Sequence, residues 1–372
     1  MLKKIISVSI TAVFLFGCSS KNNLNSEYTY RKAVELKYAE QFYAEYVEND
    51  CVHVKIGEDD YIIVPEGNTA PKSFSGAVKI NQPVYHVYNA ASSAMDLING
   101  IGAIDKVRMT STKDNDWALE YIRDAIKSGD ITYIGKYSAP DYEALLECDC
   151  DLAIESTMIY HSPDVREQIE TLGIPVLVER SSYENNPLGR MEWIKLYGLI
   201  FDCEDKANQL FDEKEAQLAE ILSAENTGKK VAFFYINSSG GVVVRKPADY
   251  VPEMIRMAGG EYIFTSEDLN TNENALSTMT IQPETFYEKA QDADILIYNS
   301  DITGSISSVD ELISKFPLIA DFKAVQEKNV WCSEKNVFQQ SLGAADMIRE
   351  LHSIITGEAD PEMTFIYRLE EK

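Results

Sequence analysis

The stretch Pro187-Leu-Gly-Arg-Met-Glu-Trp-Ile-Lys-Leu-Tyr-Gly-Leu-Ile-Phe201 decides the organisation of the chain, because it predicts a helix at the middle of the sequence. Proline fits the first turn of a helix, where its missing N–H is not needed. Apolar residues keep helical spacing from Trp193 to Leu222, with polar residues in the gaps. At ~1.5 Å per residue such a segment would span roughly 50 Å. That length is enough to join two lobes, although the polar run 202–205 is a place for a break or a kink.

Strands alternate with helices on both sides of this segment. This alternation favours parallel α/β sheets. The strands expected before the central helix are 83–88, 104–109, 131–134, 151–155 and 175–178, and those after it are 230–236, 294–298 and 330–332. Earlier in the chain, the runs 51–56 and 61–64 flank the turn Gly57–Asp60 and predict a β-hairpin.

The two halves also resemble each other in detail. Glu143 and Glu284 each open a short predicted helix, which leads through an acidic turn into a strand. The sequence therefore predicts an α/β protein with two Rossmann-like lobes, bridged by one long α-helix, with a ligand cleft between the lobes. The expected divisions are an N-terminal lobe at 36–186, an interlobe helix at 187–225 and a C-terminal lobe at 226–372.

The N-terminus has the pattern of a processing segment. Lys3 and Lys4 precede the apolar run 5–16, which is too short to remain as a membrane span. The sequence Leu-Phe-Gly-Cys18 resembles a bacterial lipobox, and the resemblance implies cleavage before Cys18 and acylation of its sulfur. Residues 1–17 would then be a signal peptide and 18–35 a tether. The alternative is a plain secretory signal with a chance cysteine.

Composition limits the function. The chain has 372 residues, 45% of them hydrophobic and 25% charged, and a formal net charge of −26. A surface this acidic repels phosphates, so we expect no nucleic-acid partner. Five cysteines besides Cys18 are an odd set for a disulfide framework, and we interpret them as small buried residues.

Four features together resemble the helical-backbone (class III) substrate-binding proteins of ABC importers, which take up ferric siderophores, haem or cobalamin. They are the lipobox, the helix entry "PLGRMEWIKLYG", the paired acidic-helix-to-strand segments, and Met257-Ala-Gly-Gly-Glu-Tyr-Ile-Phe264. The resemblance covers about 36–368. It implies a bilobed receptor in which one glutamate on each lobe docks on arginines of the permease, and Glu143 and Glu284 match those positions. The other interpretation is that they are acids favoured by the helix dipole.

Ligands of α/β sheets meet the loops at the carboxyl ends of strands. Those loops are rich in hydroxyl, amide and aromatic groups with a few cations, which suits a large oxygen-rich ligand of negative charge. The expected cleft residues are Tyr88, Ser92, Tyr160, His161, Arg180, Tyr183, Tyr235, Arg245, Lys246 and Phe338. The cations are equally compatible with ordinary surface charge. Tyr160 and His161 fit either haem-iron ligation or an exposed loop, and Tyr235 fits a core position as well.

The sequence thus predicts a lipid-anchored receptor on the extracytoplasmic face of the cell membrane. Its partners would be an ABC permease with its ATPase and an iron chelate, haem or corrinoid. We expect a monomer without catalytic residues, metal site or cofactor of its own, since any iron or cobalt would belong to the ligand. A zinc or manganese receptor is disfavoured by the supply of only four histidines. A lipid-anchored hydrolase is disfavoured because no Gly-x-Ser-x-Gly elbow is present.

Overall fold

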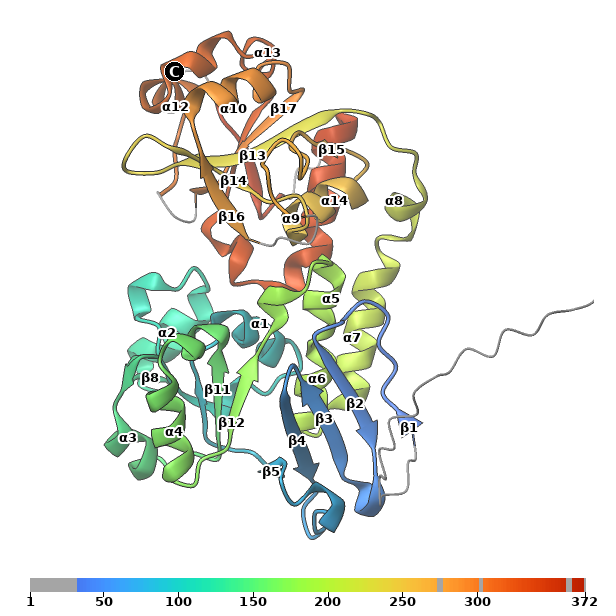
Figure 1. Ribbon diagram of the computed structural model, residues 1–372, viewed down its shortest axis with the longest axis vertical. Helices are drawn as coiled ribbons and strands as arrows, with labels where there is room; N and C mark the ends of the chain where they lie inside the picture. The colour runs from blue at the N-terminus through green and yellow to red at the C-terminus, as the bar shows by residue number, and fades with distance from the viewer. Residues whose placement is uncertain (1–31, 273–276, 301–303, 359–362, 371–372) are drawn as a thin grey trace, which may run out of the picture.

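The computed structural model describes residues 32–272, 277–300, 304–358 and 363–370. The chain forms two α/β lobes, one above the other in Figure 1, with helices running along one side of both. The α/β fold class with two lobes is therefore confirmed. The predicted signal peptide and Cys18 lie outside the described residues, as does most of the tether.

The N-terminal lobe is built on a five-stranded parallel sheet of order β12-β11-β6-β7-β8. Its strands are β6 (Val87–Asn89), β7 (Val107–Thr110), β8 (Thr132–Tyr133), β11 (Leu152–Ser156) and β12 (Val176–Glu179). Its helices are α1 (Ser92–Gly100), α2 (Glu120–Ser128), α3 (Tyr142–Glu147) and α4 (Pro163–Thr171). Leu152 and Ile154 pack with α1 and α2, whereas Ala153 packs with α3 and α4. Both faces of the sheet are thus covered, as buried parallel sheets require.

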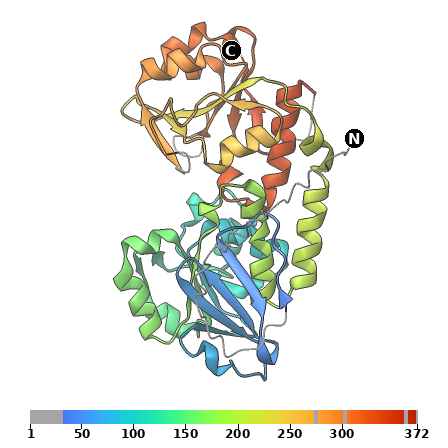
Figure 2. The same cartoon turned by 45° about the vertical axis from the view of Figure 1, so that its right-hand side comes forward.

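A second five-stranded sheet precedes this lobe in the sequence. It comprises β1 (Lys32–Ala33), β2 (Phe42–Tyr46), β3 (Val52–Ile56), β4 (Asp59–Val64) and β5 (Val78–Asn81), paired in that order. The predicted hairpin is confirmed, since β3 and β4 pair antiparallel. Only the hairpin had been expected of these five strands. Figure 2 shows the sheet standing against the helices between the lobes, and Phe42 and Trp193 pack edge to face there, with ring centres 5.0 Å apart.

The C-terminal lobe contains a mixed sheet. Its order is β16-β14-β13-β17-β18-β19, with β15 beside the start of β13. The parallel centre is β13 (Lys230–Ile236), β17 (Ile295–Tyr298) and β18 (Val330–Ser333). The remaining strands are β14 (Val242–Arg245), β15 (Glu261–Tyr262), β16 (Thr278–Ile281) and β19 (Ile366–Arg368). The helices are α9 (Tyr250–Met257), α10 (Pro283–Ala290), α12 (Val309–Lys315), α13 (Lys323–Gln326) and α14 (Ala344–Thr356).

The segment between the lobes is helical but is not one long helix, which corrects the prediction. It consists of α5 (Pro187–Glu192), α6 (Ile194–Ile200), α7 (Glu204–Ala216) and α8 (Ala219–Ser223). The chain reverses at Asp202, whose φ is +56°, so α6 and α7 form a hairpin. A Cβ atom at Gly198 would lie 2.7 Å from Cβ of Ala207, so glycine permits the close packing of these helices. In Figure 1, α7 carries the chain back toward the C-terminal lobe.

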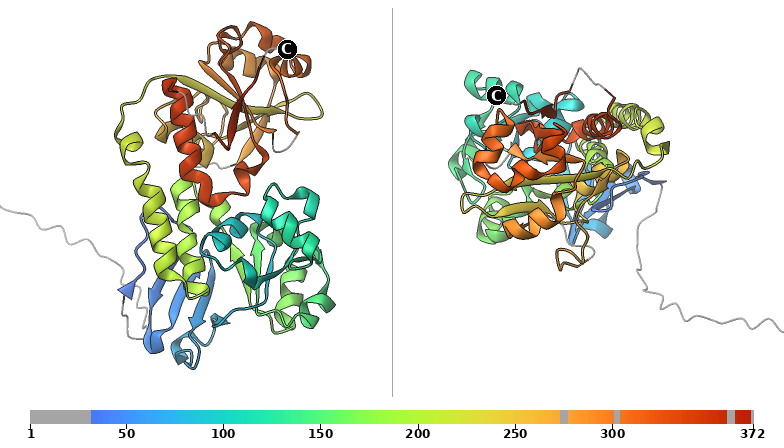
Figure 3. Two further views of the ribbon diagram at one scale, coloured as in Figure 1. Left: turned by 180° about the vertical axis from the view of Figure 1, so that it is seen from behind. Right: turned by 90° about the horizontal axis from the view of Figure 1, so that it is seen from above.

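Direct contacts also hold the lobes together. The Ser341 hydroxyl donates to the Ser93 carbonyl at 2.9 Å, and the Leu342 N–H donates to Asp96 at 2.9 Å. Lys214 on α7 pairs with Asp346 on α14 at 2.6 Å, and Figure 3 shows these two helices side by side from behind. Residues of the C-terminal lobe thus bond both to the N-terminal lobe and to α7. We therefore expect the lobes to move little relative to each other, without wide hinge opening.

The five cysteines of the described part are free thiols. Cys51 and Cys332 are buried, as predicted, whereas Cys148, Cys150 and Cys203 are only partly buried, so for these three the prediction is wrong. Burial raises the pKa of the Cys150 thiol to about 12, which keeps it protonated and unreactive.

None of the helices in the described ranges is both long and apolar enough to cross a membrane.

Candidate ligand-binding cleft

A cavity of about 650 Å³ lies where the two lobes meet. It receives residues from the N-terminal lobe, from the interlobe helix α5 and from the C-terminal lobe. Its lining consists of Ser182, Tyr183, Arg190, Arg245, Asp249, Tyr250, Ser277 and Phe338. This size and the mixture of rings with a few charged groups are typical of small-molecule sites.

Arg190 enters the cavity from α5. The helix begins at Pro187, and the Asn186 side chain accepts the Leu188 N–H at 2.8 Å as an N-cap. The Arg190 guanidinium carbon lies 3.9 Å from the centre of the Tyr250 ring, which links the helix to α9 of the other lobe. Within the described part of the chain, that guanidinium has no ion pair. Burial raises the pKa of the Glu179 carboxyl, and the positive charge of Arg190 offsets part of that rise.

Arg245 faces the cavity from the end of β14. Its guanidinium carbon lies 4.7 Å from the centre of the Phe338 ring and 5.8 Å from that of Tyr250. Asp249 holds it, with 3.5 Å between Nη1 and Oδ2. The same carboxylate caps α9 by accepting the Val251 N–H at 3.2 Å and also accepts the Ser277 N–H at 3.1 Å. Asp249 therefore contacts Arg245, the start of α9 and Ser277 together.

The charged residues that line this cavity are mostly positive, whereas the protein as a whole is acidic. Two arginines and one carboxylate line it, whereas the chain has a formal net charge of −26. Charges act more strongly in a cleft with low-dielectric walls than on an open surface. The cavity can therefore bind anionic oxygens by charge-assisted hydrogen bonds and ring faces by stacking on arginine or tyrosine.

Three of the ten residues expected at the cleft line this cavity: Tyr183, Arg245 and Phe338. Tyr88 is wholly buried in the core beneath α3 and α4, so the structure corrects that expectation. Tyr88 lies within β6, and its side chain extends from one face of the sheet into the core. It does not belong to the loop that follows β6. Tyr235 packs against the C-terminal core, in agreement with the other interpretation of that residue.

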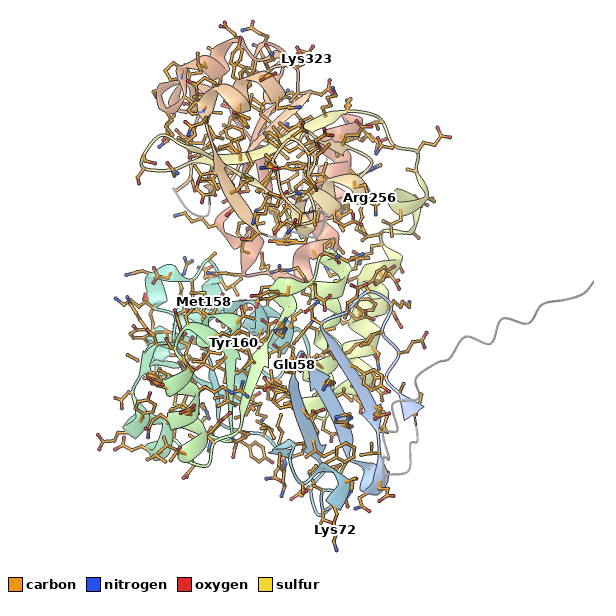
Figure 4. The ribbon with its side chains drawn as sticks, in the orientation of Figure 1. Glu58, Lys72, Met158, Tyr160, Arg256 and Lys323 are labelled. Atoms are coloured by element: carbon orange, nitrogen blue, oxygen red, sulfur yellow. The ribbon has the colours of Figure 1, made fainter. Side chains whose placement is uncertain are left out.

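The other five expected residues do not line the cavity. Ser92 is the first residue of α1, and Lys246 follows Arg245 with its N–H bonded to the Ser277 carbonyl at 2.8 Å. Tyr160 and His161 belong to an exposed turn of the N-terminal lobe, and Figure 4 shows Tyr160 on the front face of that lobe. Arg180 stacks on Tyr183, with 4.8 Å between the guanidinium carbon and the ring centre.

Glu143 and Glu284 are both exposed, each in the first turn of its helix. They lie on α3 and α10, which belong to different lobes and are well separated in Figure 1. Asp141 caps α3 by accepting the N–H groups of Glu143 and Ala144 at 3.0 and 3.1 Å. Both carboxylates are thus exposed in the first turn of a helix, one on each lobe.

Five residues that line the cavity were not among the ten expected ones: Ser182, Arg190, Asp249, Tyr250 and Ser277. Arg190 and Tyr250 lie on helices, whereas the expected residues were sought in the loops after strands. The signal for Arg190 was a cation within an otherwise apolar helix entry. The described residues contain no group of three His, Cys, Asp or Glu side chains placed to hold a metal ion.

Comparison with known proteins agrees with this architecture. An uncharacterized lipoprotein of Methanocaldococcus jannaschii is 28% identical over 289 residues, which is 75% of this chain and 67% of that protein. A periplasmic binding protein of Veillonella parvula has a similar fold, with a TM-score of 0.61 at 15% identity over 85% of this chain and 98% of its own. The periplasmic haem-binding protein HutB of Vibrio cholerae gives a TM-score of 0.58 at 19% identity, over 72% and 98% of the two chains.

The family model described as "Periplasmic binding protein" matches residues 89–335, which is more than half of the chain. The match begins within β6, so the sheet β1–β5 precedes it. The chain therefore belongs to the periplasmic binding protein family.

Proposed function

We propose that this protein is the extracytoplasmic receptor of an ABC importer, which captures a ferric siderophore or a related iron chelate in the interlobe cavity and delivers it to the permease. One observation carries the proposal: a cavity between two lobes that presents two arginines and three aromatic rings in a strongly acidic chain. Capture needs no bond to be made or broken, because charge-assisted hydrogen bonds and stacking suffice.

We further propose that acyl chains on Cys18 anchor the receptor to the membrane. The lipobox-like sequence and the lipoprotein relative support this assignment. Stable anchoring takes more than one acyl chain, which a modified N-terminal cysteine would supply.

Delivery would depend on Glu143 and Glu284. Exposed carboxylates on separate lobes can each pair with an arginine of the permease. Both pairs would form at once only when the distance between the lobes matches the distance between the arginines. We expect Glu143→Gln with Glu284→Gln to leave the affinity for the chelate unchanged and to reduce uptake of the radiolabelled chelate by cells at least tenfold. Glu147→Gln with Glu288→Gln, which removes two exposed acids from the same helices, is the matched control. Normal uptake by the first double variant would refute the docking role.

The test of capture is a titration of tryptophan fluorescence in the purified mature protein with ferric catecholate, ferric hydroxamate, haem and cobalamin. We expect saturable binding of an iron chelate at micromolar concentration or below. Tight binding of haem alone would make the protein a haem receptor instead. If none of the four compounds binds, the proposed function is wrong.

A further inference from the structure

We infer, building on the proposed function, that Gln339 is a positioning residue for ligand capture, because it clamps the two lobes together and so sets the width of the interlobe cavity. Its side chain bonds twice to the backbone of the opposite lobe. The amide oxygen accepts the Ala118 N–H at 2.7 Å, and the amide nitrogen donates to the Asp116 carbonyl at 2.8 Å. Donor and acceptor of the amide are thus both used across the lobe boundary, which fixes its orientation as well as its distance.

Two residues close behind Gln339 bond to the same lobe. The Ser341 hydroxyl donates to the Ser93 carbonyl, and the Leu342 N–H donates to the Asp96 carboxylate, both at 2.9 Å. The turn that they form packs against α1, and Figure 3 shows this junction of the lobes from behind. We call these four hydrogen bonds the interlobe clamp. All of them join protein groups to protein groups, so the clamp can form without a ligand.

The clamp adjoins the cavity in the chain. Phe338 lines the cavity and directly precedes Gln339. The Asn336 carbonyl accepts the N–H groups of Gln339 and Gln340, both at 2.9 Å, and thereby fixes the turn that holds the ring and the clamp. A shift of Gln339 away from the N-terminal lobe would therefore carry the Phe338 ring with it. The clamp thus sets the distance from this ring to Tyr183, which lines the cavity from the N-terminal lobe.

The clamp determines which fraction of the protein has its lobes at the spacing that a ligand needs. The cavity is lined from both lobes, so a ligand that touches both walls binds only while the lobes are closed. The apparent affinity is then the intrinsic affinity multiplied by the closed fraction. Two neutral hydrogen bonds correspond to roughly five- to hundredfold in the equilibrium between closed and open lobes. The Gln339 side chain thus preorganises the cavity for binding.

Amide hydrogen exchange, followed by NMR in the purified mature protein, measures the clamp directly. The Leu342 N–H is the informative group, because Asp96, its acceptor on the other lobe, stays unchanged when Gln339 is replaced. Gln339→Met keeps the size of the side chain and removes both of its hydrogen bonds. Under conditions in which the lobes reclose faster than the amide exchanges, we expect this variant to speed exchange of Leu342 roughly five- to hundredfold. The Ala153 N–H, which bonds to the Pro175 carbonyl within the N-terminal lobe, should exchange as in wild type.

Two further variants locate the effect. Gln326→Met is the matched control, because the Gln326 amide donates to the Ala320 carbonyl at 2.8 Å within the C-terminal lobe. It should leave exchange of Leu342 unchanged. Gln339→Glu keeps the acceptor for one N–H but loses the donor, and its effect should lie between those of wild type and Gln339→Met. Thermal melting followed by circular dichroism identifies any variant that fails to fold, and Gln339→Glu then provides the comparison.

A ligand should close the clamp further. The probe is whichever of ferric catecholate, ferric hydroxamate, haem and cobalamin binds most tightly to the purified protein. At about one hundred times its dissociation constant, we expect the probe to slow exchange of Leu342 roughly hundredfold in wild type, because the lobes then open only after the ligand has left. Exchange of Ala153 should not respond in the same proportion, since its hydrogen bond lies within one lobe.

The outcomes separate this inference from the proposed function. If Gln339→Met leaves exchange of Leu342 unchanged, or if Gln326→Met speeds it equally, Gln339 does not clamp the lobes, while the proposed function stands. A probe that binds without slowing exchange of Leu342 would show that the clamp has no part in capture, and the inference is then wrong. If Gln339→Met acts as expected but none of the four compounds binds, the clamp is real and the proposed function is wrong.

Discussion

Replacement of Glu192 by alanine is expected to lower the free energy of unfolding by at least about 3 kcal/mol. This carboxylate on α5 is wholly buried and accepts the N–H groups of Lys37, Tyr38 and Ala39 at 2.7–3.0 Å and the Lys195 ammonium at 2.8 Å. Its removal leaves three backbone donors without their acceptor. The buried Lys195 ammonium loses its carboxylate partner and keeps only its hydrogen bond to the Glu35 carbonyl, at 3.0 Å, among the bonds described. The measurement is urea unfolding followed by circular dichroism.

Glu215 offers the matched control. It accepts from the same stretch, through the Lys37 ammonium at 2.5 Å and the Tyr38 hydroxyl at 2.8 Å, but its side chain is 20% exposed. Ion pairs with access to water contribute little, so Glu215→Ala should cost no more than about 1 kcal/mol. Equal losses for the two variants would show that Glu192 does not hold the N-terminal segment in the way described.

The Glu192 contacts also bear on the cleft. Arg190 precedes Glu192 by two residues on α5, and Glu184, just before the helix, accepts the N–H groups of Glu40 and Gln41 at 2.9 Å. A Cβ atom at Gly189 would lie 2.8 Å from the Tyr38 carbonyl oxygen, which shows how closely the N-terminal segment packs on this helix. The segment therefore fixes the position from which Arg190 enters the cavity.

Glu155 is expected to give the protein a stability that falls as pH rises. Both carboxyl oxygens are buried in β11 without a hydrogen-bond partner among the described residues. Burial raises its pKa from 4.5 to about 8, so the folded protein holds a proton that the unfolded chain releases above pH 4.5. This stabilising contribution is complete below pH 4.5 and is lost as pH rises toward 8, at about 1.4 kcal/mol per pH unit and about 5 kcal/mol in all.

Glu155→Gln isolates this effect, because the amide resembles the protonated acid and does not titrate. We expect wild type and variant to unfold at similar urea concentrations near pH 5, and the variant to be several kcal/mol more stable at pH 9. Glu167→Gln on the exposed side of α4 is the control and should follow the wild type throughout. Parallel pH profiles for wild type and Glu155→Gln would contradict the account of a buried, protonated carboxyl.

The two-lobe plan could be predicted because the local patterns and the tertiary structure agree. The buried parallel strand β17 is a continuous apolar run, and β11 begins with one at Leu152–Ile154. Helices flank both strands, and the order of the elements along the chain then predicts the parallel sheets. The helix hairpin could not be predicted from spacing alone, since apolar periodicity continues on both sides of the turn. The chain reverses at Asp202, whose φ is +56°. The close approach of α6 and α7 further requires the small Gly198 opposite Ala207.

The site was harder to predict than the fold. Loop residues such as Tyr183 and Phe338 could be expected at the carboxyl ends of strands, and both line the cavity. Whether a side chain beside those ends points into a cleft or into the core depends on sheet pleating and helix rotation, which placed Tyr88 inside the lobe. Tyr250 faces the cavity because Asp249 caps α9 and thereby sets where the helix begins.

The most direct test is an anomalous difference map at the iron absorption edge, from crystals grown with the ferric chelate that binds best in titration. The account predicts one strong iron peak inside the interlobe cavity, between Arg190 and Arg245 and next to Tyr183. Iron bound in stoichiometric amount but located outside this cavity would contradict it.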